Sequence, residues 1–270
     1  MSLRDQFGTA LVTGASSGLG AAFAEMLLAE GIAVWGTSRS PERLARPPGW
    51  RALALELGDD ASIRRAWAEA ERDSGGIDLL VNNAGAGLFG EFGRLTDEEV
   101  RAQVEILLIG PALLARQACA AMRTRGRGCV VNVSSIAAEF PIPYLVPYSA
   151  AKAGLAGLSA GLCLEAAGSG VRVIDFRPGD YRTRFNDMMR PQPETAGERG
   201  ARVWRRLEGL LQSAPAPRRA ADDLRRALLR GRSGVVRSGS FFQAWLAPLL
   251  QRFASQGLSR RVQRRYFELR

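Results

Sequence analysis

A short apolar run at residues 9–13 leads directly into a turn that contains three glycines, and an alanine-rich helical pattern follows from about residue 19 to residue 30. Glycine adopts backbone angles that other residues avoid, and it lets two stretches of backbone approach closely. A buried strand that turns sharply into a helix is typically continued by a crossover to a neighbouring parallel strand. This unit therefore predicts an α/β fold built on a parallel sheet.

Extended and helical patterns alternate along the following residues, with no internal repeat and no linker that divides the chain. Strands are predicted at 32–36, 52–57, 77–81, 129–133 and 171–176, and helices at 61–73, 97–123 and 148–167. We expect a single Rossmann-type doubly wound parallel sheet of about seven strands, with helices on both faces and a C-terminal helical extension. Residues 1–240 are expected to form this domain, and residues 241–270 the extension.

The basic residues constrain the chemistry, because the chain has no histidine and only one lysine, Lys152, among its 37 basic residues. Nucleophilic schemes that need histidine and histidine-ligated metal sites are therefore excluded, and we expect no metal site. Lys152 follows Tyr148 by four residues, which places both on one face of a helix. Since a nearby cation stabilises a phenolate, Tyr148 is the candidate for proton transfer near neutral pH.

Cysteine usage and charge bound the location and the partners. Cys119, Cys129 and Cys163 lie in apolar stretches without paired spacing, which indicates reduced thiols in a cytoplasmic protein. The first residues lack the pattern of a secretory signal, and no uninterrupted apolar run approaches the ~20 residues of a membrane span. The net charge of +10 comes from arginines spread along the chain, so nucleic acid is not expected as a partner.

The glycine turn is a candidate phosphate site. Gly14 allows the tight turn after the strand, while Gly18 and Gly20 allow close approach of backbone, helix and a pyrophosphate. The helix that begins here directs free backbone amides and the positive end of its dipole towards phosphate. Glycine-rich turns also join strands to helices that bind nothing, so this motif alone leaves both alternatives open.

Five motifs in order resemble the short-chain dehydrogenase/reductase family, and the resemblance covers about residues 7–185. Besides the glycine turn and the pair Tyr148 and Lys152, residues 82–85 read Asn-Asn-Ala-Gly, similar to the family motif that stabilises the sheet and borders the adenosine site. Ser135 ends a β-branched strand thirteen residues before Tyr148, the family's interval. Residues 178–183, Pro-Gly-Asp-Tyr-Arg-Thr, resemble the segment whose threonine meets the nicotinamide carboxamide.

The resemblance implies roles for these residues. Ser135 would hold the substrate oxygen, Tyr148 would give or take the proton, and Lys152 would also bind the nicotinamide ribose. The family's assembly implies a homodimer or homotetramer formed through the helices near 102–123 and 148–167. The expected cofactor contacts are Gly14, Ser16, Ser17, Gly18, Leu19, Gly20, Ser38, Arg39, Glu56, Leu57, Asn82, Ala84, Gly85, Tyr148, Lys152, Pro178, Gly179 and Thr183.

Two positions depart from the family pattern. Leu107 stands where the family usually has a catalytic asparagine that helps hold a water between the lysine and solvent, and Gln103, one turn earlier, is a candidate substitute. Glu56 stands where an aspartate commonly contacts adenine. Two alternatives follow: an enzyme with a differently wired proton relay, or a catalytically weakened cofactor-binding protein that its basic C-terminus docks to a membrane or a partner.

The end of the second strand favours NADP(H) over NAD(H). Enzymes that use NAD place an acidic residue here to hold the ribose 2′-hydroxyl. This chain instead has Thr37, Ser38 and Arg39, and a guanidinium is suited to pair with a 2′-phosphate. Ser16 is expected to add a hydrogen bond. A preference for NADPH in turn favours carbonyl reduction as the working direction.

The substrate is expected to be a small hydrophobic ketone or aldehyde. By resemblance, residues at about 184–212 form a lid over the nicotinamide, to which Met188 and Met189 contribute an adaptable apolar lining. Arg184 and Arg190 in the same stretch are candidates for an acidic group on the substrate. The opposite wall is expected from Phe140, Ile142 and Tyr144.

The C-terminal extension is apolar and then basic. Residues 241–250 have a mostly helical apolar pattern, and residues 251–270 carry six arginines and one acidic residue. Such a segment is suited to peripheral contact with an anionic membrane. The alternative is a helix that closes the substrate pocket or packs in a dimer.

Overall fold

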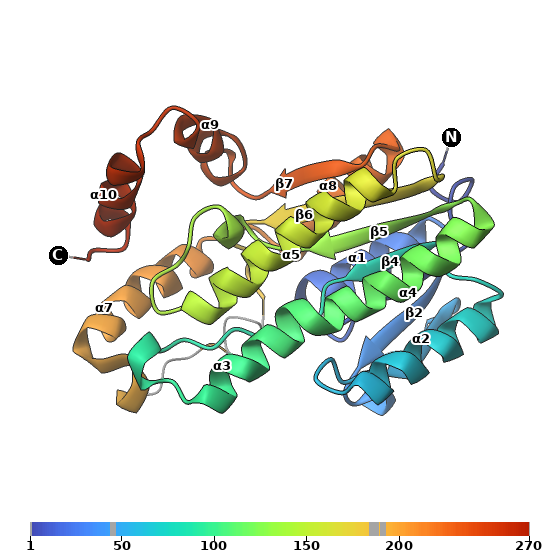
Figure 1. The fold of residues 1–270 in the computed structure, drawn as a ribbon, viewed down its shortest axis with the longest axis horizontal. Helices are drawn as coiled ribbons and strands as arrows, with labels where there is room; N and C mark the ends of the chain where they lie inside the picture. Colours follow the sequence, from blue (N-terminus) through green and yellow to red (C-terminus); the bar gives the residue numbers. More distant parts are fainter. Residues whose placement is uncertain (1, 44–46, 184–188, 190–192, 270) are drawn as a thin grey trace.

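The computed structural model describes residues 2–43, 47–183, 189 and 193–269. Seven parallel strands form one sheet in the order β3-β2-β1-β4-β5-β6-β7, which confirms the predicted fold class (Figure 1). The chain builds outward from β1 to one edge and then returns to β4 and builds to the other edge. The strands are β1 (Thr9–Val12), β2 (Ala33–Ser38), β3 (Trp50–Ala54), β4 (Leu79–Asn82), β5 (Gly128–Val133), β6 (Val171–Pro178) and β7 (Gly234–Ser238).

Helices cover both faces of the sheet. The helices α1 (Gly18–Ala29) and α8 (Pro217–Arg230) pack on one face, and α2 (Asp60–Ser74), α4 (Gly110–Arg125) and α5 (Val146–Glu165) pack on the other (Figure 1). Successive strand side chains alternate between these two cores. In β1, Ala10 and Val12 belong to the core under α1 and α8, while Leu11 belongs to the core under α2 and α4.

The third strand lies earlier in the chain than the pattern at 52–57 predicts. Its parallel pairing with β2 begins at Val34 and Trp50 and ends at Ser38 and Ala54. The Trp50 indole packs across Gly36, where an added Cβ would lie 2.3 Å from the ring. This close packing of the tryptophan ring on a glycine of the neighbouring strand accompanies the observed register. No apolar run in the sequence indicates such a contact.

The predicted helical region at 97–123 is one long, locally unwound helix. It consists of α3 (Asp97–Val104), the π-helical turn η3 (Glu105–Ile109) and α4. Among the described residues, this stretch from Asp97 to Arg125 is the one helix long and apolar enough to cross a membrane. Because α4 packs on α2, β4 and β5, it is a layer of the domain, and its apolar composition is no argument for a span.

The C-terminal third completes the sheet and covers its carboxyl edge. The sequence patterns located neither β7 nor α8, because β7 is a five-residue, half-exposed edge strand without a continuous apolar run. In Figure 1, α7 (Pro193–Gln212) and α10 (Gln256–Tyr266) lie beyond the carboxyl ends of the strands. The remaining short helices are η1 (Pro41–Arg43), η2 (Phe92–Arg94), η4 (Ile136–Ala138), η5 (Phe242–Leu246) and α9 (Ala247–Gln251).

Candidate active site

The glycine turn joins β1 to the N-terminus of α1. Gly14 and Gly18 have φ angles of 67° and 59°, which other residues rarely adopt. A Cβ at Gly20 would lie 2.2 Å from the Gly14 carbonyl oxygen, so Gly20 serves the close packing of helix on turn. No side chain caps the N-terminus of α1, where Ser17 is the N-cap residue. The open amides and the helix dipole fit an anionic phosphate.

A second loop, after β4, is joined to this turn by hydrogen bonds of Thr13 and Asn83. Neither residue is among the expected cofactor contacts. The Thr13 hydroxyl accepts hydrogen bonds from the backbone N–H groups of Asn83 and Ala84, both at 2.9 Å. The Asn83 side-chain amide donates to the Thr13 carbonyl oxygen at 2.9 Å. A polar residue at the end of each of two adjacent buried strands was the available signal.

Asn82 lies behind the site and does not line it. Its amide donates to the carbonyl oxygen of Pro111 at 2.9 Å and to the side-chain oxygen of Asn132 at 3.0 Å. Asn132 in turn donates to the Ser159 hydroxyl at 2.9 Å. These buried bonds tie β4, β5, α4 and α5 together, so Asn82 supports the sheet edge from which the loops project.

One cavity of about 590 Å³ lies at the carboxyl ends of the strands, where the strand order reverses. This is the usual ligand position in open α/β sheets. Gly20, Asn82, Phe140 and Tyr144 do not line it, and Met188 lies outside the described residues. The predicted site residues that line it are Gly14, Ser16, Ser17, Gly18, Leu19, Ser38, Arg39, Glu56, Leu57, Ala84, Gly85, Ser135, Ile142, Tyr148, Lys152, Pro178, Gly179, Thr183 and Met189.

Tyr144 packs into a small core beside the cavity. Its ring stacks on Phe89 with 5.4 Å between the ring centroids, and its backbone has a φ of 64°. Ile142 and Met189 join the same core and also line the cavity. Of the predicted substrate wall, the structure therefore brings Ile142 and Met189 to the cavity, while Tyr144 supports them from behind.

Ser135, Tyr148 and Lys152 meet at one end of the cavity. Ser135 ends the loop after β5, and its hydroxyl is hydrogen-bonded to the Tyr148 hydroxyl. Lys152 lies one helical turn after Tyr148 on α5 and is 5% exposed. Its ammonium donates to the Val133 carbonyl oxygen at 2.7 Å and lies 5.9 Å from the centroid of the Tyr148 ring.

Burial dominates the titration of both helix residues. It raises the pKa of Tyr148, which the Ser135 hydrogen bond opposes and the negative charge of Asp180 reinforces. It lowers the pKa of Lys152 to about 8, and the carboxylate of Asp175 opposes that change. The expected lowering of the Tyr148 pKa is therefore wrong for the protein alone, because burial outweighs the contributions that favour the phenolate. At neutral pH the protein holds Tyr148 as a neutral phenol.

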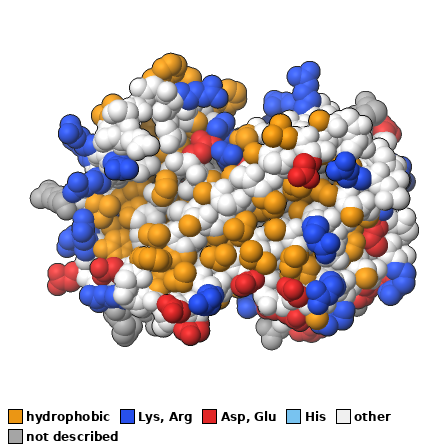
Figure 2. Space-filling view, viewed as in Figure 1, with side chains coloured by type: hydrophobic (Ala, Val, Ile, Leu, Met, Phe, Trp, Pro, Cys, Tyr) orange, Lys and Arg blue, Asp and Glu red, His pale blue; other side chains and the backbone are white. Residues whose placement is uncertain are grey.

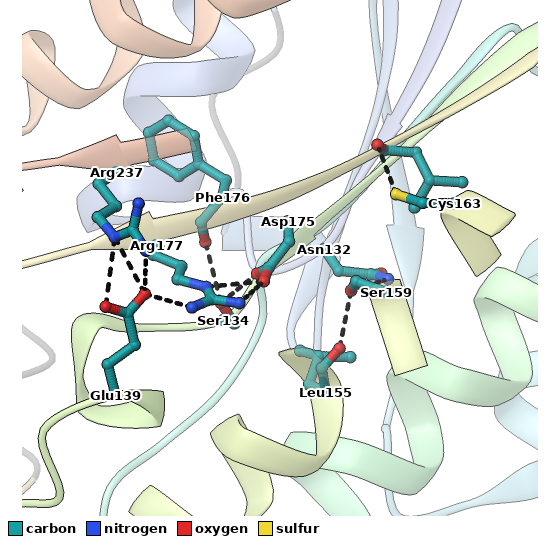
Figure 3. A network of polar contacts seen from close by, with 11 residues as sticks. Asn132, Ser134, Glu139, Leu155, Ser159, Cys163, Asp175, Phe176, Arg177 and Arg237 are labelled. Carbon is teal, nitrogen blue, oxygen red and sulfur yellow. Dashed lines mark hydrogen bonds and ion pairs between the residues drawn. The ribbon is translucent and has the colours of Figure 1, made fainter. Parts of the chain in front are cut away.

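A polar network joins Ser134 and Glu139, which lie before and after Ser135, to residues of β6 and β7 (Figure 3). Asp175 accepts hydrogen bonds from Ser134 and from the Arg177 Nε, the latter at 2.7 Å. Arg177 also pairs with Glu139, which Arg237 contacts at 2.7 Å. Ser134 and Glu139, on either side of Ser135, are thus held to β6 and β7, and Asp175, whose charge opposes the lowering of the Lys152 pKa, is part of the same network.

Leu107, expected at the position of the family's asparagine, lies where the long helix is interrupted. It lies in the π-helical turn η3, is fully buried and lines the cavity. A Cβ at Gly85 would lie 2.7 Å from a Leu107 methyl carbon, so these two residues are in close contact. Gln103 does not substitute, because its side-chain oxygen accepts the Leu88 N–H at 3.2 Å and it does not line the cavity.

The far end of the cavity carries the groups expected to meet the adenosine. Arg39 is exposed at its edge, beside Ser38, whose hydroxyl accepts the Ser40 N–H at 3.2 Å. Glu56, which follows the adjacent strand β3, also lines the cavity. Within the described ranges, no three potential ligands among cysteine, aspartate and glutamate gather as they would around a metal ion.

Comparison with known proteins agrees with this geometry. The family model described as short chain dehydrogenase matches residues 8–194. A 3-ketodihydrosphingosine reductase from Bacteroides thetaiotaomicron is 37% identical over 178 residues, which span 66% of this chain and 65% of that protein. The chain thus matches slightly less than two thirds of that relative.

Solved structures of the same kind superpose over most of the chain. A short-chain dehydrogenase from Streptomyces avermitilis gives a TM-score of 0.79 at 34% identity and covers 92% of this chain and 93% of its own. One from Burkholderia cenocepacia in complex with NADP gives a TM-score of 0.71 at 27% identity, with 94% and 100% covered. Another neighbour, a short chain dehydrogenase/reductase from Burkholderia phymatum that was solved in complex with NAD, shares the fold with a TM-score of 0.78 at 22% identity, with 86% of this chain and 89% of its own covered.

Proposed function

The chain belongs to the short-chain dehydrogenase family, and from this premise we propose that it is an NADPH-dependent reductase of a hydrophobic ketone or aldehyde. It is an NAD(P)-dependent oxidoreductase by family. The observation that carries the finer proposal is the meeting of Ser135, Tyr148 and Lys152 at one end of a cavity whose other end holds a glycine turn and Arg39.

The proposed reaction uses these side chains in distinct ways. A bound nicotinamide dinucleotide supplies the hydride for the carbonyl carbon. The Ser135 hydroxyl holds the substrate oxygen, and the Tyr148 hydroxyl donates its proton to that oxygen as negative charge develops there. A raised pKa keeps Tyr148 in the protonated form that reduction requires. The Lys152 ammonium then stabilises the phenolate left behind.

Arg39 and Ser38 support the choice of NADPH. They lie at the end of β2, at the edge of the cavity, where no carboxylate of the segment 37–40 repels a 2′-phosphate. A guanidinium pairs with the 2′-phosphate of NADP through two parallel hydrogen bonds. The neutral 2′-hydroxyl of NAD cannot form such a pair. Glu56 is a candidate for contact with the adenine.

Apolar side chains around the reactive end support a hydrophobic substrate. Ile142, Leu145, Met189, Leu207 and Leu211 line this part of the cavity, and the last two come from α7. We propose that α7 forms the described part of the substrate lid; Arg184, Arg190 and the rest of the predicted lid at 184–188 and 190–192 lie outside the described residues. The 37% identical Bacteroides relative is named a 3-ketodihydrosphingosine reductase, which supports the reduction of a carbonyl group.

The experiment is NADPH oxidation, followed at 340 nm, with alkyl ketones and aldehydes of increasing chain length. We expect kcat/KM to increase with chain length, because each added methylene that is buried in the cavity contributes about 0.8 kcal/mol to binding. Tight NADPH binding without turnover on any carbonyl compound would instead favour the alternative, a catalytically weakened cofactor-binding protein. Leu107 in place of asparagine is the feature that motivates this alternative.

We also propose a homodimer or homotetramer through α4 and α5. Figure 2 shows hydrophobic side chains along this face, with charged side chains towards its borders. On α5, Leu164 is 80% exposed, and a Cβ at Gly157 or Gly161 would meet nothing within 4 Å. A partner helix can approach such a surface closely.

Light scattering should show that the wild type is a dimer or a larger species. The substitution Gly161→Glu should shift the protein towards monomer, and a monomeric wild type would contradict the proposed assembly.

The C-terminal extension has two parts with different surroundings. Phe267 is buried against α7 in the core that contains Met189 and Trp204, so α10 supports the proposed lid. By contrast, Trp245 and Phe253 are 71% and 84% exposed. The other exposed apolar residues of this C-terminal apolar surface are Phe241, Phe242, Leu246, Leu249, Leu250, Leu258 and Val262.

We propose that the C-terminal apolar surface makes peripheral contact with anionic lipid, in an otherwise cytoplasmic protein. Exposed arginines of α10, including Arg260 and Arg261, supply the charge complementarity. The protein should sediment with vesicles that contain phosphatidylserine and less with neutral ones, and Trp245→Glu with Phe253→Glu should abolish this. Equal recovery in the supernatant with both vesicles would contradict the proposal, and loss of a dimer in the double variant would assign the surface to a second copy.

A further inference from the structure

The loop after β6 forms part of the cavity wall, and the chain that follows β7 holds it. Gly179 and Asp180 line the cavity. The negative charge of Asp180 helps to raise the pKa of Tyr148, so this loop belongs to the reactive end. The Gly179 N–H donates to the carbonyl oxygen of Ser238, the last residue of β7, at 2.7 Å. A Cβ at Gly239 would lie 3.4 Å from the Gly179 Cα, so the two stretches of backbone are in contact.

Gln243 of the C-terminal extension adds a two-point contact to the same loop. It is the second residue of η5, and its side-chain amide donates to Asp180 Oδ2 at 2.5 Å. Its side-chain oxygen accepts the Asp180 backbone N–H at 3.2 Å. A Cβ at Gly179 would lie 2.5 Å from that oxygen, so this close approach depends on glycine there. Because one side chain engages both the backbone and the carboxylate of Asp180, it fixes the position and the orientation of the loop.

The same extension also reaches the loop that carries Ser135. The side-chain amide of Gln251 on α9 donates to the Glu139 carbonyl oxygen at 3.2 Å. Glu139 directly follows η4, at whose N-terminus the Ser135 hydroxyl accepts the Ala137 N–H at 3.0 Å. Two glutamines from residues 243–251 therefore contact both loops that form the reactive end, one after β5 and one after β6.

We propose that Gln243 is a positioning residue for carbonyl reduction, which acts through Asp180 by holding the loop after β6 against the reactive end. This deepens the proposed function and rests on it. Gln243 is not among the described residues that line the cavity, so its effect on the reaction passes through Asp180 and Gly179, which do line it. Hydride transfer depends steeply on the distance and orientation of the reacting groups, so a small displacement of this wall is costly.

The position of Gln243 predicts an effect on turnover without a matching effect on cofactor affinity. Arg39 and the glycine turn line the other end of the cavity and supply the proposed phosphate contacts. Loss of the contact between Gln243 and Asp180 leaves those groups in place. Hence kcat should fall, while the Kd for NADPH should change by less than about threefold.

The experiment is a double-variant cycle between Gln243 and Asp180. Gln243→Glu removes the donor to the Asp180 carboxylate and places a second carboxylate against it. We expect kcat to fall by about 10- to 100-fold, the range of a lost hydrogen bond to a charged group. Asp180→Asn supplies an amide that can donate to the new carboxylate. In the Asp180→Asn background, Gln243→Glu should therefore change kcat by less than about threefold.

A control variant and a second readout separate positioning from a general loss of structure. Gln256 is an exposed glutamine of the same extension, on α10, and Gln256→Glu should keep the wild-type kcat. Amide hydrogen exchange is measured on the protein without cofactor, because the Asp180 N–H donates to Gln243. This amide should exchange faster in Gln243→Glu than in the wild type, and the double variant should exchange as Asp180→Asn does.

The outcomes separate this inference from the function on which it rests. A wild-type kcat in Gln243→Glu, or the same fall in kcat in both backgrounds, would overturn the positioning role and leave the reductase standing. A wild type that reduces no carbonyl compound with NADPH or NADH would overturn the reductase, and the positioning role with it. Should Gln243→Glu not fold, Gln243→Met replaces it: kcat should fall by about 10- to 100-fold at unchanged NADPH affinity, and a wild-type kcat would overturn the assignment.

Discussion

Replacing Lys152 by methionine should change the pH dependence of stability in a predictable direction. Lys152 is 5% exposed, and burial lowers its pKa from the ordinary value of 10.5 to about 8. Below pH 8 the folded protein must hold the ammonium in a poorly solvated place, while the unfolded chain holds it in water. Because the pKa of Lys152 is lower in the folded protein than in the unfolded chain, Lys152 lowers the free energy of unfolding by about 3 kcal/mol at pH 7 and by about 1 kcal/mol at pH 10.

The sign follows from proton binding. Between pH 8 and pH 10.5 the unfolded chain binds more protons at this residue than the folded protein does, so the free energy of unfolding contributed by Lys152 rises with pH. Methionine has similar length and no charge, and it removes this contribution. All other titrating groups are common to both proteins and cancel in the comparison.

The assay is urea unfolding of wild type and Lys152→Met at pH 7 and pH 10. The stability of the wild type relative to the variant should rise by about 2 kcal/mol between the two values. The lost hydrogen bond to Val133 and any packing change shift both comparisons alike. A relative stability that is equal at the two pH values, or that falls with pH, would refute the burial of a charged lysine at this position.

Three further substitutions test the cofactor end and the altered proton relay. Arg39→Leu should raise the KM for NADPH by about 10- to 100-fold and leave that for NADH nearly unchanged; an equal effect on both would place the 2′-phosphate elsewhere. Gly20→Ala should abolish NADPH binding in a fluorescence titration, because its methyl group would meet the Gly14 carbonyl oxygen at 2.2 Å; wild-type affinity would contradict that packing. Leu107→Asn should preserve NADPH binding and preserve or raise turnover. It should lower the free energy of unfolding by about 2–4 kcal/mol, because buried apolar volume is lost. Lower turnover at unchanged NADPH affinity would show that leucine is needed at this position.

The sequence predicted those parts of the fold that depend on local patterns. Short apolar runs located β1, β2, β4, β5 and β6, and the glycine turn located the start of α1. The bounds of the third strand differ from those predicted, since β3 begins at Trp50, whose indole packs across Gly36 of the neighbouring strand, and this long-range contact leaves no local pattern. The edge strand β7 pairs with β6 and is only partly buried. Its own residues therefore lack the continuous apolar run that located the other strands.

The site shows the same division. Spacing along one helix brought Tyr148 and Lys152 together, and the strand ends brought Ser135 beside them. The direction of the Lys152 ammonium, towards Val133 instead of the phenol, depends on side-chain geometry that spacing does not encode. The contact of Gln243 with Asp180 joins residues 63 positions apart, and no motif links them.

The most direct test of the account is the turnover of Tyr148→Phe beside its affinity for NADPH. Phenylalanine keeps the ring in its place and removes only the hydroxyl that is hydrogen-bonded to Ser135. We predict that kcat for carbonyl reduction falls by about 10²- to 10⁴-fold, while the Kd for NADPH changes less than about threefold, well under 1 kcal/mol. Reduction at close to the wild-type rate would show that the proton comes from another group and would contradict the proposed mechanism.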